Sequence, residues 1–224
     1  MSKQNKFKIV IPSYNNEKWV EYNTASIISQ TYKNYDVLYI NDKSTDNTPN
    51  LINNIKNKYN LENWTILNNP KNMQRGYNVN PNAPHIIDFM NGDDDILLFV
   101  DGDDWLINDK VLENLNNYYN QNDPWMTYGG MYCWPSSQKA SPQNTEYSDH
   151  VHNNNLYRKD VWRASHLRSF KWFLYKQIKK EDLIWSKTGE YYYNAEDFAV
   201  SYFCLEMCPK HKIGVVDFPT YAYN

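Results

Sequence analysis

The residues best suited to carry chemistry are carboxylates that follow short apolar runs. Asp101, Asp103 and Asp104 come directly after the apolar run at residues 96–100. In an extended chain, side chains two residues apart point to the same side, so Asp101 and Asp103 can face one spot. Neighbouring carboxylates repel each other unless a cation or a hydrogen-bond donor lies between them. Such hard oxygen ligands suit Mg²⁺ or Mn²⁺, with water and a substrate diphosphate completing the coordination shell.

The alternative interpretation of this acidic motif is a turn that caps the next helix. Its position directly after an apolar run favours a metal and sugar-nucleotide site. No Walker-type phosphate loop and no GxGxxG motif follows any apolar run, so the sequence predicts neither a P-loop nor a dinucleotide site. It also lacks the GxSxG and HExxH patterns of hydrolases and zinc proteases. A divalent cation is therefore expected to neutralise the phosphate charge.

These carboxylates need a framework that brings distant segments together. Apolar runs that read as strands alternate with helical patterns through the first half of the chain. We predict strands at residues 8–12, 36–40, 64–67 and 96–100, and helices at 17–30, 49–59 and 84–91. This alternation is typical of an α/β fold with a mainly parallel central sheet flanked by helices. In such a sheet, ligands bind where the strands end at their carboxyl side.

The alternation of apolar runs and helical patterns becomes less regular after residue 104. Polar loops longer than about 15 residues are commonly binding loops or lids, and such a loop is expected here. We predict a helix at residues 108–120, a strand at 125–132, a long polar loop at 134–155, helices at 161–179 and 196–207, and a terminal strand at 213–223. Because the chain shows no internal repeat and no linker, we expect a single domain over residues 1–224.

Charge and composition narrow the class of protein. The net charge is −3 and no basic stripe is visible, which argues against a nucleic-acid partner. The start of the chain lacks the apolar region of a signal peptide, and no run approaches the ~20 apolar residues of a membrane span. Three cysteines without a CxxC pair support neither a disulfide framework nor a zinc ribbon. We expect a soluble protein of a reducing compartment, the cytoplasm.

Asparagine is over-represented, at 32 of 224 residues, and 19 lysines stand against 4 arginines. Codons for Asn, Lys, Tyr and Ile are AT-rich, so we hypothesise an AT-rich source genome, that of a large virus or a bacterium. For a virus, the compartment is the host cytoplasm. Tryptophan has a single G-rich codon, so the same drift does not explain the 8 Trp residues. Trp positions therefore carry more information than Tyr or Asn positions.

Four segments resemble glycosyltransferase family 2. They are IVIPSYN at residues 9–15, SIISQTY at 26–32, NDKSTDNT at 41–48 and FVDGDD at 99–104, and they occur in the family's order. The resemblance implies a GT-A fold, which is a Rossmann-like single domain with a DXD motif. It implies a nucleotide-diphospho-sugar donor, usually a UDP-sugar, and Mn²⁺ or Mg²⁺ as cofactor. It also implies transfer with inversion at the anomeric carbon to a glycan, lipid or protein acceptor.

The resemblance assigns donor-binding roles to single residues. Pro12 and Tyr14 match positions that pack on the nucleotide base, and an aromatic face suits uracil. Asp42 matches the residue that hydrogen-bonds the uracil imide. Arg75 falls where the family often places a basic residue near the base or diphosphate, and its planar fork suits phosphate oxygens. The alternatives are a Tyr that covers the sheet edge and an Arg on the surface.

The resemblance also assigns the acidic residues. Asp101 matches the ribose-binding or metal-adjacent residue and Asp103 the metal ligand itself, so we assign the metal to both. Asp104 either assists or caps the next helix. The segment NAEDFA matches the acidic motif at the start of a late helix, where the Asp acts as catalytic base. We assign that role to Asp197, with Glu196 as fallback; the alternative is that both acids only complement the helix dipole.

His166 lies in a segment that is similar to a less characterised subset of the family. It is a candidate ligand of the metal or the phosphate, or an acceptor-site residue, with a structural role as the alternative. Trp105, Trp134 and residues 191–193 are candidate sugar-stacking surfaces, although packing in the core is the commoner role of aromatic residues.

The leading interpretation is a metal-dependent inverting glycosyltransferase. Residues 1–104 are then the nucleotide-sugar-binding half, and residues 105–224 the acceptor-binding half. A nucleotidyltransferase is one alternative, but the Gly-rich phosphate loop that it needs after the first strand is absent. A catalytically silent sugar-nucleotide or glycan-binding module is another. That alternative is disfavoured because the acidic positions that the chemistry needs are all present.

Overall fold

The first half of the chain forms the predicted alternation of strands and helices. The computed structural model describes residues 3–136, 138–139, 144–193 and 195–224. The elements of this half are β1 (Phe7–Ser13), α1 (Val20–Ile28), β2 (Tyr35–Asn41), α2 (Thr48–Lys58), β3 (Trp64–Asn68), α3 (Arg75–Asn78), α4 (Pro84–Phe89) and β4 (Ile96–Phe99). Every strand and helix predicted for this half is present, and α3 is an additional short helix.

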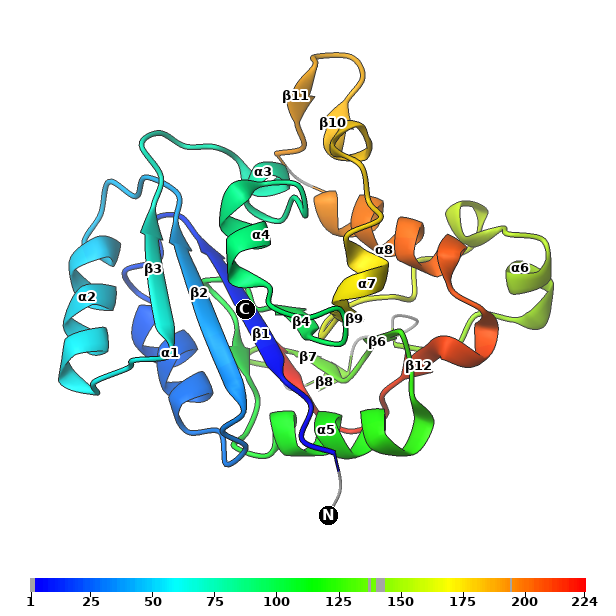
Figure 1. Cartoon of the computed structure of the whole chain (residues 1–224), viewed down its shortest axis with the longest axis horizontal. Coiled ribbons are helices and arrows are strands. Elements are labelled where there is room, and N and C mark those ends of the chain that lie inside the picture. The colour runs from blue at the N-terminus through cyan, green and yellow to red at the C-terminus, as the bar shows by residue number, and fades with distance from the viewer. Residues whose placement is uncertain (1–2, 137, 140–143, 194) are drawn as a thin grey trace.

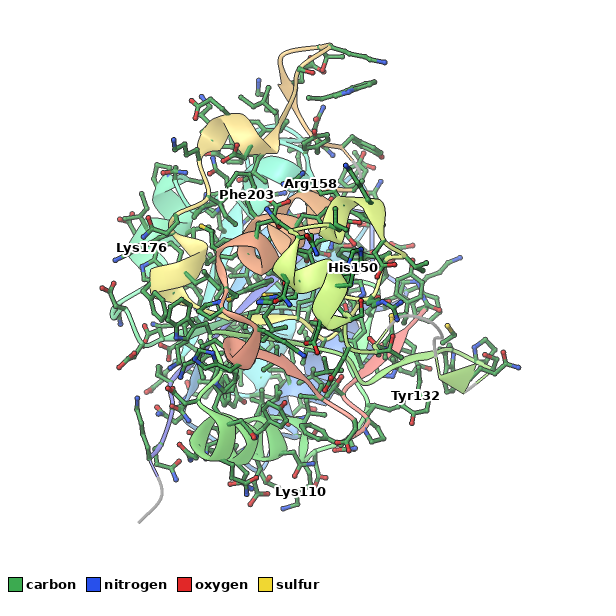
Figure 2. All side chains as sticks on the ribbon, turned by 90° about the vertical axis from the view of Figure 1, so that its right-hand side faces the viewer. Lys110, Tyr132, His150, Arg158, Lys176 and Phe203 are labelled. Carbon is green, nitrogen blue, oxygen red and sulfur yellow. The ribbon has the colours of Figure 1, made fainter. Side chains whose placement is uncertain are left out.

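The second half consists of shorter elements. They are β5 (Trp105–Leu106), α5 (Val111–Asn122), β6 (Met126–Tyr128), β7 (Met131–Cys133), β8 (Gln138–Lys139), α6 (Asp149–Asn153), η1 (Tyr157–Lys159), β9 (Ser169–Lys171), α7 (Trp172–Tyr175), η2 (Lys180–Leu183), β10 (Ile184–Trp185), β11 (Glu190–Tyr191), α8 (Glu196–Met207), η3 (Lys210–Lys212), β12 (Ile213–Val215) and β13 (Tyr221–Tyr223). Figure 2 shows β7 and β8 at the side of the molecule marked by Tyr132, and the β10–β11 hairpin at its top. Among the helices described, none combines the length and the apolar surface needed to span a membrane.

The central sheet has seven strands in the order β12-β6-β9-β4-β1-β2-β3 (Figure 1). β1 is parallel to β2 and β4, β2 is parallel to β3, and β6 is parallel to β12. β9 is antiparallel to both of its neighbours, β4 and β6. All seven residues of β1 are buried, as expected for a parallel strand covered on both faces. The predicted α/β fold with a mainly parallel sheet is confirmed.

Helices cover both faces of this sheet (Figure 1). On β1, Ile9 and Ile11 pack in a cluster with residues of α1, α2 and α5, whereas Val10 packs with residues of α4, α7 and α8. Successive side chains of a strand point to opposite faces, so neighbours in the sequence enter different clusters. The sheet is therefore the middle of three layers.

The predicted strand at residues 125–132 is two strands, β6 and β7. Gly129 and Gly130 separate them with φ of +118° and +80°, which L-residues with a side chain rarely adopt. β7 leaves the central sheet and joins a second sheet with the order β5-β13-β7-β8. The predicted terminal strand at residues 213–223 divides in the same way, into β12 of the central sheet and β13 of the second sheet.

The predicted helix at residues 161–179 is wrong. Residues 169–171 form β9, and only Trp172–Tyr175 are helical. β9 lies between β4 and β6, where Ser169 pairs with Leu98 on one side and with Thr127 on the other. The helical spacing of apolar residues is overridden because two long-range partners satisfy the backbone groups of this segment. The predicted loop at residues 134–155 contains β8 and α6; residues 137 and 140–143 of it lie outside the described residues.

Candidate active site

The carboxyl ends of β1, β2 and β4 meet at one edge of the central sheet. A cavity of about 180 Å³ opens there, and five of the predicted site residues line it: Pro12, Tyr14, Asp42, Arg75 and Asp103. The lining is completed by Ser13, Asn16, Asn72, Gln74, Asn78 and Tyr193. The fold therefore brings together four of the five predicted donor-binding residues and one of the two predicted metal ligands; Asp101, predicted for both roles, does not line the cavity.

Gly102 allows the acidic motif to lie directly against the end of β1. Its backbone N–H donates to the carbonyl oxygen of Pro12 at 3.1 Å. A Cβ atom at this position would lie only 2.5 Å from Ser13 Oγ and from Asn16 Nδ2. The absence of a side chain is thus what permits the close approach of β1 and the motif.

Asp42 shapes the floor of the cavity. Its buried carboxylate accepts hydrogen bonds from the backbone N–H of Met73 at 2.8 Å and of Gln74 at 3.1 Å. The side-chain amide of Asn69 donates a third hydrogen bond, at 2.7 Å. Asp42 therefore holds in place the loop that leads into α3 and Arg75, a role that the sequence did not suggest.

Arg75 joins three distant parts of the chain. Its Nη2 is hydrogen-bonded to Asp101 Oδ1 and its Nε to Glu196 Oε1, although Arg75 and Glu196 are 121 residues apart. Burial would lower the pKa of Arg75, but these two carboxylates raise it well above its usual range. Burial raises the pKa of Glu196 even though Arg75 lies beside it. Arg75 is therefore an ion-paired residue at the cavity and not a free surface arginine, and its predicted role near the base or diphosphate stays a prediction.

A second set of contacts connects the acidic motif to the start of α8. Arg168 Nη1 donates to Asp197 Oδ2 at 2.9 Å, and Arg168 Nη2 lies 2.8 Å from His166 Nε2. His166 Nε2 in turn lies 3.6 Å from Asp101 Oδ2. Arg168 is a site residue that sequence reasoning missed. Its signal was present, because it is one of only 4 arginines in a lysine-rich chain.

The two carboxylates of the DXD motif differ in charge balance. Burial would raise the pKa of Asp101, but the guanidinium of Arg75 holds it well below its usual range. Asp103 is exposed, and its pKa is raised by partial desolvation and by the neighbouring charge of Asp101. Negative charge at the cavity is therefore balanced at Asp101 and left unbalanced at Asp103.

Asp104 does not cap the next helix. It is 1% exposed, and its Oδ1 accepts a hydrogen bond from the backbone N–H of Asn224 at 2.8 Å. Helix α5 begins later, at Val111, and its N-cap is Lys110. Burial, and then the charge of Asp101, raise the pKa of Asp104 to about 8. The capping prediction is wrong because β5 comes between the acidic motif and the helix.

Asp197 is the more accessible of the two acids that open α8. Its side chain is 23% exposed, against 5% for Glu196, which is bound to Arg75. Burial would raise the pKa of Asp197, but Arg168 lowers it. Asp197 Oδ1 also accepts a hydrogen bond from the backbone N–H of Phe198 at 2.9 Å. The structure thus provides an ionised carboxylate, held in place, that solvent and ligands can reach.

His166 lies between two tyrosine rings. Its ring stacks on Tyr221, with centroids 4.7 Å apart and an interplanar angle of 14°, and on Tyr223 at 5.8 Å. Burial and the charge of Arg168 lower its pKa, so the imidazole is neutral and Nε2 accepts from Arg168. Its Nδ1 is buried and has no hydrogen-bond partner among the described residues. His166 therefore positions Arg168, and its predicted role as a ligand of metal or phosphate stays a prediction.

The carboxylates at the cavity fit a divalent cation that a substrate helps to hold. No three His, Cys, Asp or Glu side chains within the described part of the chain lie close enough to bind a metal by themselves. Mg²⁺, however, is commonly held by one or two carboxylates together with substrate phosphates and water. Asp103, exposed and repelled by Asp101, offers a carboxylate of the kind that such a cation needs.

Comparison with curated proteins finds glycosyltransferases. An uncharacterized glycosyltransferase of Haemophilus influenzae is 33% identical over 121 residues, which cover 54% of this chain and 45% of the relative. A poly(ribitol-phosphate) beta-glucosyltransferase of Bacillus spizizenii is 31% identical over 126 residues, covering 55% of this chain and 19% of the relative. The chain thus matches less than half the length of either relative.

Solved structures share the fold over a larger part of the chain. The crystal structure of Staphylococcus aureus TarS 1–349 aligns with 98% of this chain and 60% of its own, at a TM-score of 0.70 and 18% identity. A mannosyltransferase of Pyrobaculum calidifontis, PcManGT, aligns with 78% of this chain and 47% of its own, at a TM-score of 0.56 and 15% identity. The sequence model of glycosyl transferase family 2 matches residues 8–183. The chain belongs to glycosyltransferase family 2 and has its GT-A fold.

Proposed function

We propose that this chain transfers a sugar from a UDP-sugar to an acceptor hydroxyl, with inversion at the anomeric carbon and with a divalent cation. One observation carries the proposal: Arg75 binds both Asp101 of the acidic motif and Glu196, the neighbour of Asp197, so the motif and the start of α8 are held together beside the cavity. Two structural relatives support it. TarS was crystallised with UDP-GlcNAc, and PcManGT with GDP-Man and Mn²⁺.

The cavity offers complementary groups for a nucleotide. The ring of Tyr14 is 44% exposed and provides a face on which a base can stack. Asp42 accepts three hydrogen bonds from the chain, and a carboxylate has about four lone-pair positions. One position therefore remains for the imide N–H of uracil. The planar guanidinium of Arg75 suits the oxygens of the diphosphate. To bind them, Arg75 gives up its hydrogen bond to one of its two carboxylate partners, Asp101 or Glu196.

Asp197 acts as the base in this mechanism. Its ionised carboxylate takes the proton of the acceptor hydroxyl, while the acceptor oxygen forms a bond to the anomeric carbon. The bond from that carbon to the diphosphate breaks on the opposite side, and a single displacement inverts the configuration. Arg168 keeps the pKa of Asp197 low and fixes its orientation. A cation at Asp101 and Asp103 would supply charge neutralisation of the leaving diphosphate.

The two halves of the chain divide the work in this proposal. The cavity lining comes from residues 12–103, with Tyr193 as the contribution of the second half. Asp197 and Arg168 come from residues 105–224. We therefore keep 1–104 as the donor half and 105–224 as the acceptor half, built on one shared sheet.

Nucleoside diphosphate release tests the proposal. The protein is incubated with a panel of UDP- and GDP-sugars, with Mn²⁺, with Mg²⁺ and with EDTA. We expect release from one UDP-sugar, lost in EDTA and in Asp103→Ala. Asp94→Ala is the matched control, since Asp94 is an exposed acid at the other end of β4. If no donor is consumed and Asp103→Ala binds UDP like the wild type, the proposal fails. Donor binding without turnover would identify a silent binding module.

A further inference from the structure

A cluster of aromatic rings lies next to the acidic motif in the fold and outside the cavity described above. We call it the aromatic strip; it consists of Trp19, Tyr22, Trp105 and Trp134. Trp105 contacts the other three, with ring centroids 6.1 Å from Trp19, 5.7 Å from Tyr22 and 5.6 Å from Trp134. None of the four lines the cavity at Tyr14 and Asp103.

Regular secondary structure holds the rings in place. Trp19 and Tyr22 are the N-cap and a first-turn residue of α1, three positions apart and therefore on one face of the helix. Trp105 belongs to β5 and pairs with Ala222 of β13. Trp134 follows β7, and its backbone N–H donates to the carbonyl of Tyr223 at 2.6 Å. Three elements far apart in the sequence thus present the rings side by side.

The strip is exposed where an aromatic cluster is normally buried. Tyr22 is 60% exposed and Trp134 is 52% exposed. Single apolar residues on a surface need no explanation, whereas a contiguous patch marks a binding site. Three of the four residues are tryptophans, and the AT-rich codon bias of this chain does not explain its tryptophans. The strip is therefore a candidate ligand-binding surface.

The charged residues around the strip indicate which kind of ligand it binds. The cation–π contacts of the described residues involve other rings, such as Phe89, Tyr59 and Trp185, and leave the faces of the strip to a ligand. Three exposed charged residues lie next to Trp19 and Tyr22 in sequence: Glu17, Lys18 and Glu21. With one cation between two acids, this border offers no basic patch to an anionic polymer or an anionic lipid surface. Acid oxygens accept hydrogen bonds from hydroxyl groups, and ring faces stack on the C–H faces of sugars.

We infer that the aromatic strip binds a neutral glycan chain, the acceptor of the transfer reaction. The inference rests on the proposed function. Trp105 follows Asp103 by two residues. Trp19, Tyr22 and Trp105 lie 5.7–6.1 Å from one another, so their rings form a compact platform on which sugar rings can stack. Trp105 pairs with Ala222, so it lies on the face of the small sheet opposite Tyr221 and Tyr223, which stack on His166. The acceptor chain therefore passes around the sheet edge, with its reacting end at Asp197 and its remaining units on the strip.

Oligosaccharide binding tests this inference. Calorimetry compares neutral cello- and chito-oligosaccharides of one to six units. We expect the best hexamer to bind at least about tenfold more tightly than its dimer, a difference of about 1.4 kcal/mol. The Tyr22→Ala/Trp134→Ala variant is expected to lose this gain and to keep UDP binding. Tyr59→Ala, which removes a ring that is 51% exposed at the end of α2, is the control.

Each other outcome has a defined meaning. Equal affinity for short and long oligosaccharides, or no effect of the double variant, refutes the inference. So does a different occupant: strip-dependent binding to phosphatidylserine vesicles, or strip-dependent dimers in light scattering. Strip-dependent glycan binding by a protein that turns over no donor would refute the proposed function and leave the strip a glycan-binding surface. Donor turnover without glycan binding would support the proposed function and refute the inference about the strip.

Discussion

Replacing Arg168 by methionine tests whether this buried guanidinium holds the base in place. Arg168 is 4% exposed and donates to Asp197 and to His166. Removing one partner of a buried ion pair costs about 3–5 kcal/mol, because the other charge is left unpaired. Since Asp197 is 23% exposed, water compensates part of this loss, and we expect about 2–3 kcal/mol. For a chain of this size, the melting temperature then falls by about 5–10 °C.

The same change alters the pH dependence of the reaction. Without Arg168, the largest opposition to the effect of burial is lost and the pKa of Asp197 rises, so less of the base is ionised at a given pH. We expect kcat to fall and the acidic limb of its pH profile to move to higher pH. The KM for the donor is unchanged, because Arg168 does not line the donor cavity. Arg168→Lys retains the charge and restores part of kcat.

A double-mutant cycle separates this reasoning from a general loss of packing. Adding Asp197→Asn to Arg168→Met removes the unpaired charge, so the double variant is expected to be more stable than Arg168→Met alone. Denaturant unfolding measures all four proteins. A coupling energy below about 0.5 kcal/mol is indistinguishable from additivity. That result, or an unchanged pH profile, would refute the argument.

Three further predictions concern the metal, the close approach at the motif, and acid stability. Asp103→Asn abolishes stimulation by Mn²⁺ in the release assay but leaves the melting temperature unchanged, since Asp103 is exposed. Gly102→Ala destabilises by about 1–3 kcal/mol in denaturant unfolding, whereas Gly92→Ala, with its nearest neighbour 3.7 Å away, is close to neutral. Burial would raise the pKa of Asp36, but Lys6 and Lys8 lower it. These ion pairs stabilise the fold at pH values above the unfolded pKa of Asp, about 3.9, and their contribution is lost as the pH falls through the lower folded pKa. Asp36→Asn is therefore expected to make the unfolding free energy depend less on pH in this acidic range.

Local patterns in the sequence predict several of the residues that lie at the ends of β1 and β4. The apolar run of β4 gives way abruptly to Asp101 and Asp103, and the motif ending β1 places Tyr14 at the cavity. Each of these residues sits within a few positions of the strand that carries it. Because parallel strands end at a common edge, the strand pattern was sufficient to bring them together.

The second half was less predictable because long-range contacts determine it. Residues 161–179 have helical spacing, yet pairing with β4 and β6 makes residues 169–171 a strand. The contact of Arg75 with Glu196 spans 121 residues and has no local signature. Asp104 resembles a helix cap in sequence, and only the position of β13 gives it a backbone partner.

The antiparallel strand β9 also determines when Arg168 can reach its partners. The pairing of β9 with β4 ends where Ser169 lies opposite Leu98, and the residues before Ser169 lead back to His166, which lies beside Asp101. A slip of one residue would turn Arg168 and Asp197 away from each other. The partners of β9 lie 42 to 75 residues away in sequence. Contacts between such distant residues slow folding, because a long loop must close before they form. Arg168 and Asp197 are therefore expected to meet only when β9 has paired with both β4 and β6.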